Sequence, residues 1–188
     1  GAFMSLIGSE KLRDAVDISP QASEILYELN RGVKQSLRQS GEDNSTRDGM
    51  DLCLCVLPAH KNGSEKVNIE FSGANRPLWI VKKETGELEE IRATKHAIGG
   101  LTSEEQKFAQ NNVELKKGDT VYLFSDGYAD QFGGDNSKKL MTKKFKEILV
   151  SIKHKTMPQQ HDHLDEFIET WKGNAEQLDD ILVIGYRV

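Results

Sequence analysis

The spacing of apolar residues changes along the chain, and this change restricts the fold more than any other feature of the sequence. Over residues 22–37 apolar side chains recur at steps of three and four, which predicts an amphipathic helix. Over residues 51–92 they fall into short runs separated by turn sequences, which predicts strands joined by hairpins. Helices followed by an antiparallel meander favour an α+β fold over a parallel sheet with crossover helices.

The remaining elements follow from the same patterns. Helices are predicted over residues 2–16, 139–153 and 158–171, and the helix ending near residue 37 has Ser19 as N-cap, Pro20 in its first turn and Gly41 after its end. Hairpin turns are expected at residues 61–64 and 84–87. The predicted strands cover residues 51–57, 66–72, 78–83, 88–92, 113–115, 120–125 and 180–187.

These elements predict one domain over residues 1–188, in which two antiparallel β-sheets pack together and helices flank them. The helix over residues 20–37 should bury Ile25, Leu26, Leu29 and Val33 against one sheet.

Composition excludes some classes of function. The net charge of −5 argues against a nucleic-acid surface, and no apolar stretch approaches the roughly 18 to 20 residues that span a bilayer. Cys53 and Cys55, the only cysteines, alternate along a predicted strand, where packing in the core is favoured over a metal or redox role. A reducing, cytoplasmic compartment is therefore expected.

Two acidic motifs stand at the ends of predicted strands. Asp126 and Gly127 follow the apolar strand over residues 120–125, and Asp179 and Asp180 precede the last strand. Each motif alone is also what a surface turn or a solvated strand start looks like.

Taken in order, several segments resemble the landmarks of SpoIIE/RsbU-type serine phosphatases, a branch of the protein phosphatase 2C-like (PPM) family. Residues 1–8 are similar to the segment after the family's Asp-x-x-Gly-His-Gly motif, and residues 47–51 stand where that branch opens a central strand. Residues 72–77 look like its Asn-Ala-Gly-His-x-Pro turn, with Asn75 in place of the histidine, and residues 97–100 resemble its Pro-Leu-Gly segment. Residues 118–127 resemble its Gly-Asp-x-x-x-x-x-Thr/Ser-Asp-Gly strand, and residues 179–181 its closing Asp-Asp-Ile/Met.

The resemblance implies hydrolysis of phosphoserine or phosphothreonine by a water that two Mn²⁺ or Mg²⁺ ions activate. The substrate implied for this branch is a regulatory protein, an anti-sigma-factor antagonist. Asp126 and Asp179 are carried over as metal ligands, with Gly127, Asp180 and Asp51 as neighbours of the metal site. If a strand begins at Asp179, its side chain and that of Asp180 face opposite ways, so that only one points into the site.

The family's bridging aspartate and its Gly-His-Gly would precede Gly1. The chain as given is therefore expected to be inactive, with a metal site that is empty or partly filled, and to lack the family's N-terminal strands. A sheet edge left open by those strands should be covered by formation of a homodimer, by a rearrangement of the chain's own ends or by a crystal contact. A catalytically silent binding or signal-relay module of the same fold is the alternative. A basic run on a predicted helix is read as a solvated face or a docking surface for an acidic partner; it comprises Lys138, Lys139, Lys143, Lys144 and Lys146.

Overall fold

The computed structural model describes residues 2–39, 47–58 and 65–188, with side chains from Met4 onward. The chain divides into two compact units. The first unit comprises Gly1–Leu78 and Ile91–Leu115, and the second comprises Trp79–Glu90 and Lys116–Val188. Each is described by itself below. No helix among the described residues is both long enough and apolar enough to cross a membrane.

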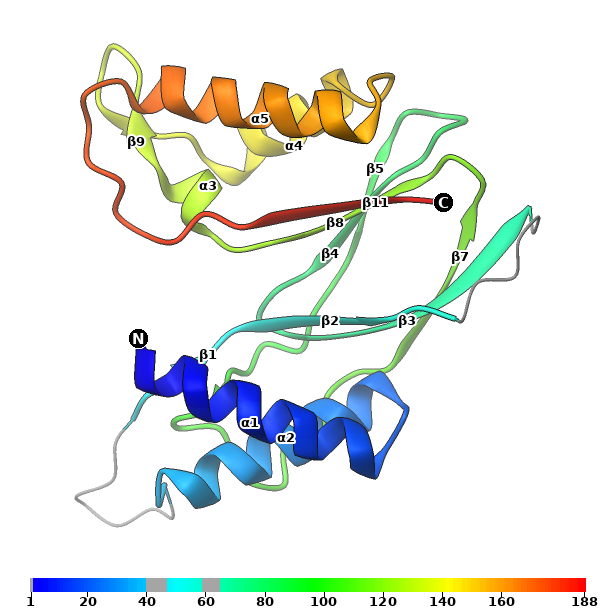
Figure 1. Ribbon diagram of the computed structural model, residues 1–188, viewed down its shortest axis with the longest axis vertical. Coiled ribbons are helices and arrows are strands. Elements are labelled where there is room, and N and C mark those ends of the chain that lie inside the picture. The colour runs from blue at the N-terminus through cyan, green and yellow to red at the C-terminus, as the bar shows by residue number, and fades with distance from the viewer. Residues whose placement is uncertain (1, 40–46, 59–64) are drawn as a thin grey trace. The chain divides into compact units, whose positions relative to one another are not determined.

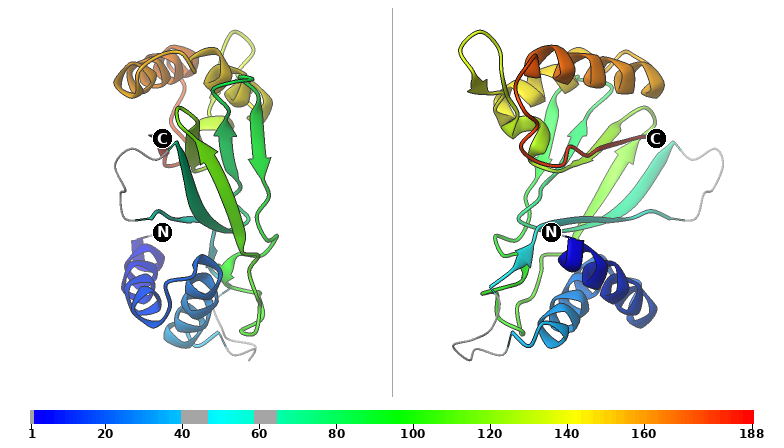
Figure 2. Two further views of the ribbon diagram at one scale, coloured as in Figure 1. Left: turned by 90° about the vertical axis from the view of Figure 1, so that its right-hand side faces the viewer. Right: turned by 60° about the vertical axis from the view of Figure 1, so that its left-hand side comes forward.

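The first unit places two helices beside a three-stranded sheet (Figures 1 and 2). The helices are α1 (Ala2–Ile18) and α2 (Ala22–Ser36). The sheet has the order β2-β3-β7, formed by Leu52–Val56, Lys66–Ala74 and Asn111–Lys116. A separate antiparallel pair joins β1 (Gly49–Met50) to β6 (Ile98–Gly99).

Helix α2 buries the face that its periodicity predicts. Ile25, Leu26, Leu29 and Val33 are all buried, in one apolar cluster with Ala74 of β3. The expected burial of this helix against a sheet is therefore confirmed.

The predicted start of this helix was wrong by two residues. The helix begins at Ala22 with Gln21 as its N-cap, because the hydroxyl of Ser19 accepts a hydrogen bond from the backbone N–H of Gln21 (3.2 Å) and forms a turn before the helix. Pro20 lies in that turn. The predictions for Gly41 and for the turn at residues 61–64 lie outside the described residues.

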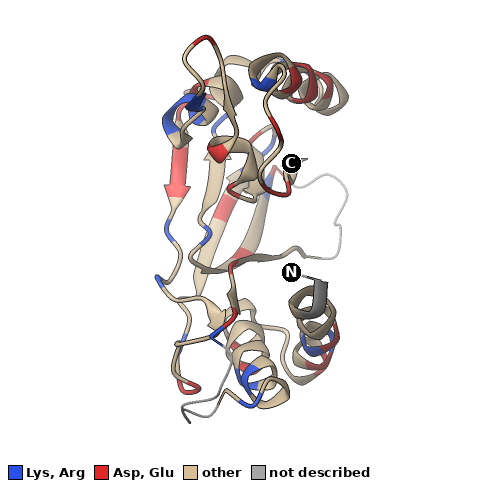
Figure 3. Cartoon of the chain, turned by 90° about the vertical axis from the view of Figure 1, so that its left-hand side faces the viewer, with Lys and Arg blue, Asp and Glu red and all other residues tan. Residues whose placement is uncertain are grey.

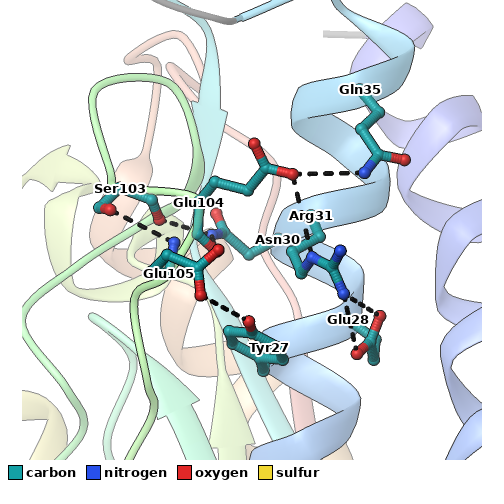
Figure 4. Close-up of polar contacts among 8 residues, drawn as sticks. All are labelled: Tyr27, Glu28, Asn30, Arg31, Gln35, Ser103, Glu104 and Glu105. Atoms are coloured by element: carbon teal, nitrogen blue, oxygen red, sulfur yellow. Dashed lines mark hydrogen bonds and ion pairs between the residues drawn. The ribbon is translucent and has the colours of Figure 1, made fainter.

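Polar side chains of α2 fix the segment that follows β6 (Figure 4). The amide of Asn30, which is fully buried, donates to the carbonyl of Ser103 (2.8 Å) and accepts from the N–H of Gly99 (2.8 Å). The hydroxyl of Tyr27 donates to Glu105 (2.9 Å). A buried amide with partners on both atoms gives this irregular segment a defined position, since an unpaired buried polar group is costly.

The second unit is built on a four-stranded antiparallel sheet with the order β11-β8-β4-β5. The strands are Val183–Arg187, Thr120–Phe124, Leu78–Val81 and Leu88–Ile91. The same unit contains helices α4 (Thr142–Ser151) and α5 (Met157–Lys172). In the sheet, β11 lies beside β8, as Figures 1 and 2 both show. Between β8 and α4 lie the one-turn helix α3 (Gly127–Asp130) and a hairpin of β9 (Phe132–Gly133) and β10 (Lys138–Lys139).

An aromatic cluster forms the core of the second unit. Trp79 of β4 stands opposite Tyr122 of β8 and meets Phe145 of α4 edge to face, with ring centroids 5.4 Å apart. Tyr128 of α3 stacks on the same Phe145 at 4.4 Å. This cluster attaches α3, and with it the residue that precedes it, to the sheet.

The second unit corrects two expectations. The helix predicted from residue 139 begins only at Thr142, because Lys138 and Lys139 pair with Gly133 and Phe132 in the hairpin and Met141 takes a positive φ of 72° that no α-helix accommodates. The basic run is therefore divided between a strand and a helix. The last strand begins at Val183 rather than at residue 180.

Both acidic and basic residues occur on the helices (Figure 3). Ion pairs join Lys11 to Asp14 within α1 and Lys172 to Glu169 within α5. The α+β prediction of antiparallel sheets flanked by helices is confirmed. Strands β1, β6, β9 and β10 and helix α3 were not predicted.

Candidate metal site

Asp126 lies where strand β8 passes into helix α3. It follows Ser125 and occupies the N-cap position of α3, where its carbonyl accepts from the N–H of Asp130 (2.9 Å). The buried strand places it at the end of the sheet, and the side chain is half-buried. The carboxylate that the sequence predicts as a metal ligand therefore lies at a strand end, next to the start of a helix.

Ser125 joins this strand end to the segment before β11. Its N–H donates to the carbonyl of Leu182 (3.0 Å), and its hydroxyl donates to the carbonyl of Asp180 (2.7 Å) and accepts from the N–H of Leu182 (3.0 Å). These bonds continue the β8–β11 contact past its last ladder pair, Phe124–Val183. Sequence reasoning assigned Ser125 no role, although a serine before Asp-Gly at a strand end was visible.

Gly127 is required by a close approach of the backbone. A Cβ built on Gly127 would collide with the carbonyl of Asp180, its carbon lying at 2.9 Å. The group that approaches this glycine in the structure is therefore the Asp180 carbonyl.

Asp179 and Asp180 both lie before strand β11. Both are exposed, and the carboxylate of Asp179 accepts from the N–H of Asp180 (2.8 Å). The argument that strand alternation points the two side chains to opposite faces does not apply here, because neither residue is in the strand.

A small cavity of about 140 Å³ adjoins Asp179. Asp130 and Lys139 line this cavity and form an ion pair with an N–O distance of 2.9 Å. Gly127 also lines it, whereas Asp126 is not among its lining residues. The segments that carry Asp126 and Asp179 therefore lie side by side in the second unit, although 53 positions separate the two residues (179 − 126).

Gln131 also lines the cavity. Its side-chain amide is 2% exposed and donates to the carbonyls of Phe132 and Glu176, both at 3.0 Å. Trp171 of α5 donates to the main-chain oxygen of Gln131 (3.1 Å). The irregular chain between α5 and β11 is thereby attached next to Asp179. Neither the residue type of Gln131 nor its position relative to the acidic motifs indicates this role in the sequence.

The donor types at this place suit Mn²⁺ or Mg²⁺, which prefer carboxylate and carbonyl oxygens. Asp126 and Asp179 provide carboxylates, and the cavity adds that of Asp130. Over residues 2–39, 47–58 and 65–188 no group of three or more His, Cys, Asp or Glu side chains is arranged to hold a metal. The carboxylate oxygens at this place are therefore of the chemical type that binds a divalent ion.

Asp51 belongs to the first unit and precedes β2. One carboxylate oxygen accepts from the side chain of Asn75 (2.9 Å) and the other from Arg76 (2.9 Å). Asn75 occupies the left-handed region (φ 60°), so its turn is held against the start of β2 by Asp51. The structure thus gives Asp51 two protein partners.

The family profile of Stage II sporulation protein E (SpoIIE) matches residues 1–188. The chain belongs to the SpoIIE family. No curated protein matches it. Among solved structures, this SpoIIE-family chain is similar to the SiaA-PP2C domain of Pseudomonas aeruginosa, with a TM-score of 0.83, 22% identity, and coverage of 100% of this chain and 70% of that one.

Two further structures show the same fold at lower identity. The PP2C phosphatase domain of SpoIIE from Bacillus subtilis, solved with a fragment of its regulatory domain, gives a TM-score of 0.69 at 18% identity, covering 99% of this chain and 50% of that one. The PPM Ser-Thr phosphatase MsPP from Mycobacterium smegmatis gives 0.58 at 12% identity, covering 96% and 80%. The SpoIIE-family resemblance stated from the sequence is confirmed, and the fold is that of a PP2C-type serine/threonine phosphatase domain.

Proposed function

We propose that this SpoIIE-family protein is a metal-dependent phosphatase that hydrolyses phosphoserine or phosphothreonine in a regulatory protein. The observation that supports the proposal is the side-by-side placement of the segments carrying Asp126 and Asp179, joined by Ser125. In this proposal residues 1–188 form one phosphatase domain. The substrate class we favour, from the resemblance to SpoIIE/RsbU-type enzymes, is an anti-sigma-factor antagonist in the cytoplasm.

Each residue has a distinct part in this proposal. Asp126 and Asp179 bind divalent cations through their carboxylates, and Asp180 is a neighbour of that site. Gly127 permits the approach of the Asp180 backbone. Mn²⁺ or Mg²⁺, when bound, supplies positive charge that offsets the phosphate and lowers the pKa of a bound water toward 7. The protein's own contribution is to hold the carboxylates at fixed strand ends.

The proposal is tested by phosphatase activity of the full-length protein on p-nitrophenyl phosphate with Mn²⁺. Asp126→Ala and Asp179→Ala should each abolish Mn²⁺-dependent hydrolysis and weaken Mn²⁺ binding in calorimetry. Asp135→Ala, which removes an exposed carboxylate from the β9–β10 hairpin, is the matched control and should leave both unchanged. Equal activity in Asp126→Ala and the unaltered protein would refute the assignment.

One observation favours a second candidate, a catalytically silent module that binds or relays a signal. The described residues present no preformed group of three metal-binding side chains. This candidate predicts that the full-length, folded protein binds no divalent cation and hydrolyses no phosphomonoester, whereas it still binds its phosphorylated partner protein.

We also propose that a second copy of the chain pairs with the free edge of β11. This strand ends the sheet order. Its residue Ile184 is 50% exposed, and Leu182, which directly precedes the strand, is 55% exposed. A groove of about 490 Å³ between α5 and this strand, lined in part by Met157 and Leu164, adjoins the edge. Unpaired strand edges with apolar side chains readily accept another strand. Light scattering after size exclusion should then show a dimer that Ile184→Lys dissociates.

A further inference from the structure

A second cavity of the second unit gathers basic side chains. It has a volume of about 360 Å³. Four basic groups line it: Lys83 after β4, Lys153 and His154 after α4, and Arg187 of β11. The other lining residues are Val81, Gly118 and Thr120, and none of the seven is acidic. Three separate stretches of chain thus bring cations to one hollow of a protein whose net charge is −5.

The floor of this cavity is formed by three residues that are paired across three neighbouring strands of the sheet. Thr120 of β8 is the ladder partner of both Val81 of β4 and Arg187 of β11, so the three side chains share a face of the sheet. The main chain of Val188, next in sequence, pairs with Gly118 (2.6 Å) and Asp119 (3.1 Å) and fixes the end of β11. The floor is therefore a rigid part of the fold.

Arg187 is held in a defined orientation. Its guanidinium donates to the hydroxyl of Thr120 (3.0 Å) and to the carbonyls of Lys155 (2.9 Å) and Lys153 (3.0 Å). A guanidinium has five N–H groups, so N–H groups remain beyond these three bonds. The planar guanidinium can direct two N–H groups at two oxygens of one phosphate group.

Among the described residues, the other three basic side chains of the cavity have no acidic partner. In the described part of the chain, no hydrogen bond or ion pair joins the side chains of Lys83, Lys153 or His154 to another residue. Several other lysines, among them Lys82, Lys139 and Lys146, do have carboxylate partners.

The nearest buried carboxylate, that of Asp119, already has partners of its own. It accepts from the main-chain N–H groups of Lys83 (2.9 Å) and Lys116 (3.1 Å) and lies 3.6 Å from the ammonium of Lys82. Several cations facing one hollow repel each other unless an anion lies between them.

Two glycine turns leave room for the lysines. Gly86, with a φ of 72°, lies against the ammonium of Lys153, and Gly118, with a φ of 94°, lies against the side chain of Lys83. A side chain at either turn would displace the lysine. The lysine positions are thus part of the local packing.

We propose that this cavity is a binding site for a small anion that carries phosphate groups, such as a diphosphate. The volume lies at the lower end of the range of small-molecule pockets, which suits a compact polyanion. The site lies at the Thr120 end of β8, whereas Asp126 follows the Phe124 end, about 13 Å away at the rise of a β-strand. It does not depend on the proposed phosphatase function and uses none of the residues assigned to the candidate metal site.

A purely structural role makes a different prediction. A cation after a helix is stabilised by the helix's last carbonyl groups, and Lys153 follows α4. In that case the chain would bind no phosphate at this place, and its affinity for anions would not depend on Lys83.

The test is calorimetric titration of sodium pyrophosphate into the full-length protein, in EDTA and at constant ionic strength, so that no divalent cation takes part. The double variant Lys83→Gln/Lys153→Gln should weaken pyrophosphate binding by about tenfold or more, since it removes two charge-assisted contacts. The control Lys138→Gln/Lys143→Gln loses the same charge elsewhere in the second unit and should bind within about twofold of the unaltered protein. Thermal unfolding without ligand checks that both double variants fold.

The outcomes separate the explanations. Asp126→Asn should retain pyrophosphate binding, which distinguishes this site from the candidate metal site. ADP and a phosphoserine peptide, titrated in parallel, show whether the phosphate comes from a nucleotide or a protein. No saturable binding at millimolar pyrophosphate, or an equal loss of affinity in the two double variants, would overturn the proposal.

Discussion

Gly127→Ala tests the closest backbone approach of the candidate metal site. The added methyl group would collide with the carbonyl of Asp180, and a backbone group cannot move aside as the end of a flexible side chain can. Overpacking of this kind costs typically about 1 to 3 kcal/mol. Alanine favours a helix over glycine by up to about 1 kcal/mol, and Gly127 begins α3 without a positive φ, so this gain opposes the loss.

The steric term exceeds the helical one, and Gly127→Ala should lower the free energy of unfolding by about 1 to 2 kcal/mol. It should also weaken Mn²⁺ binding by the full-length protein, because Asp180 and its neighbour Asp179 must shift away from Asp126. Urea denaturation and calorimetry measure the two effects.

Gly32→Ala is the matched control. Gly32 lies inside helix α2, and a Cβ there would meet only the side chain of Lys11, at 3.1 Å, which can move. This substitution should raise the free energy of unfolding by about 0.5 to 1 kcal/mol through helix propensity. If Gly127→Ala proves as stabilising as Gly32→Ala, the close contact between Gly127 and Asp180 does not exist, and the reasoning about the site fails.

Two further predictions concern the strand β8. Ser125→Ala should lower the free energy of unfolding by about 1 to 3 kcal/mol in urea denaturation, because the N–H of Leu182 and the carbonyl of Asp180 lose their partner. Faster hydrogen exchange of the Leu182 amide would confirm that these bonds are the ones lost. Unchanged exchange there would contradict it. Burial raises the pKa of Tyr122 from 10.0 to about 12. The unfolded chain therefore releases this proton first, and stability should fall by about 2 to 3 kcal/mol as the pH rises from 10 to 12. Tyr122→Phe should flatten that fall, whereas an unaltered pH profile would show that the phenol is not responsible.

The parts of the fold that the sequence predicted are those with strong periodicity. Helix α2 shows its buried face through Ile25, Leu26, Leu29 and Val33, because an amphipathic helix must repeat its apolar residues at the helical period. Strand β8 was recognisable as a continuous apolar run. The element bounds shifted where side chains compete with the backbone pattern, as Ser19 does before α2.

The parts that escaped prediction depend on contacts between distant segments. The hairpin of β9 and β10 is too short to show a period, and the positive φ of Met141 is not visible in a methionine. The motifs indicated Asp126 and Asp179. The contacts of Ser125 and Gln131 could not be predicted, since each side chain binds main-chain groups about 45 to 57 positions away. Such partners are fixed only by the folded chain.

Two side chains fix the register between β8 and β11, one at each end of the ladder: Thr120 of β8 and Ser125, which directly follows β8. Ser125 binds the main chain at Asp180 and Leu182 beyond one end of the ladder, and at the other end the hydroxyl of Thr120 accepts from Arg187. A slip by one residue would break all of these bonds and turn each side chain of β11 to the opposite face. These bonds, and not the length of the chain between α5 and β11, therefore fix the register. Insertions or deletions before position 176 should leave Asp179 beside α3 and Arg187 beside Thr120.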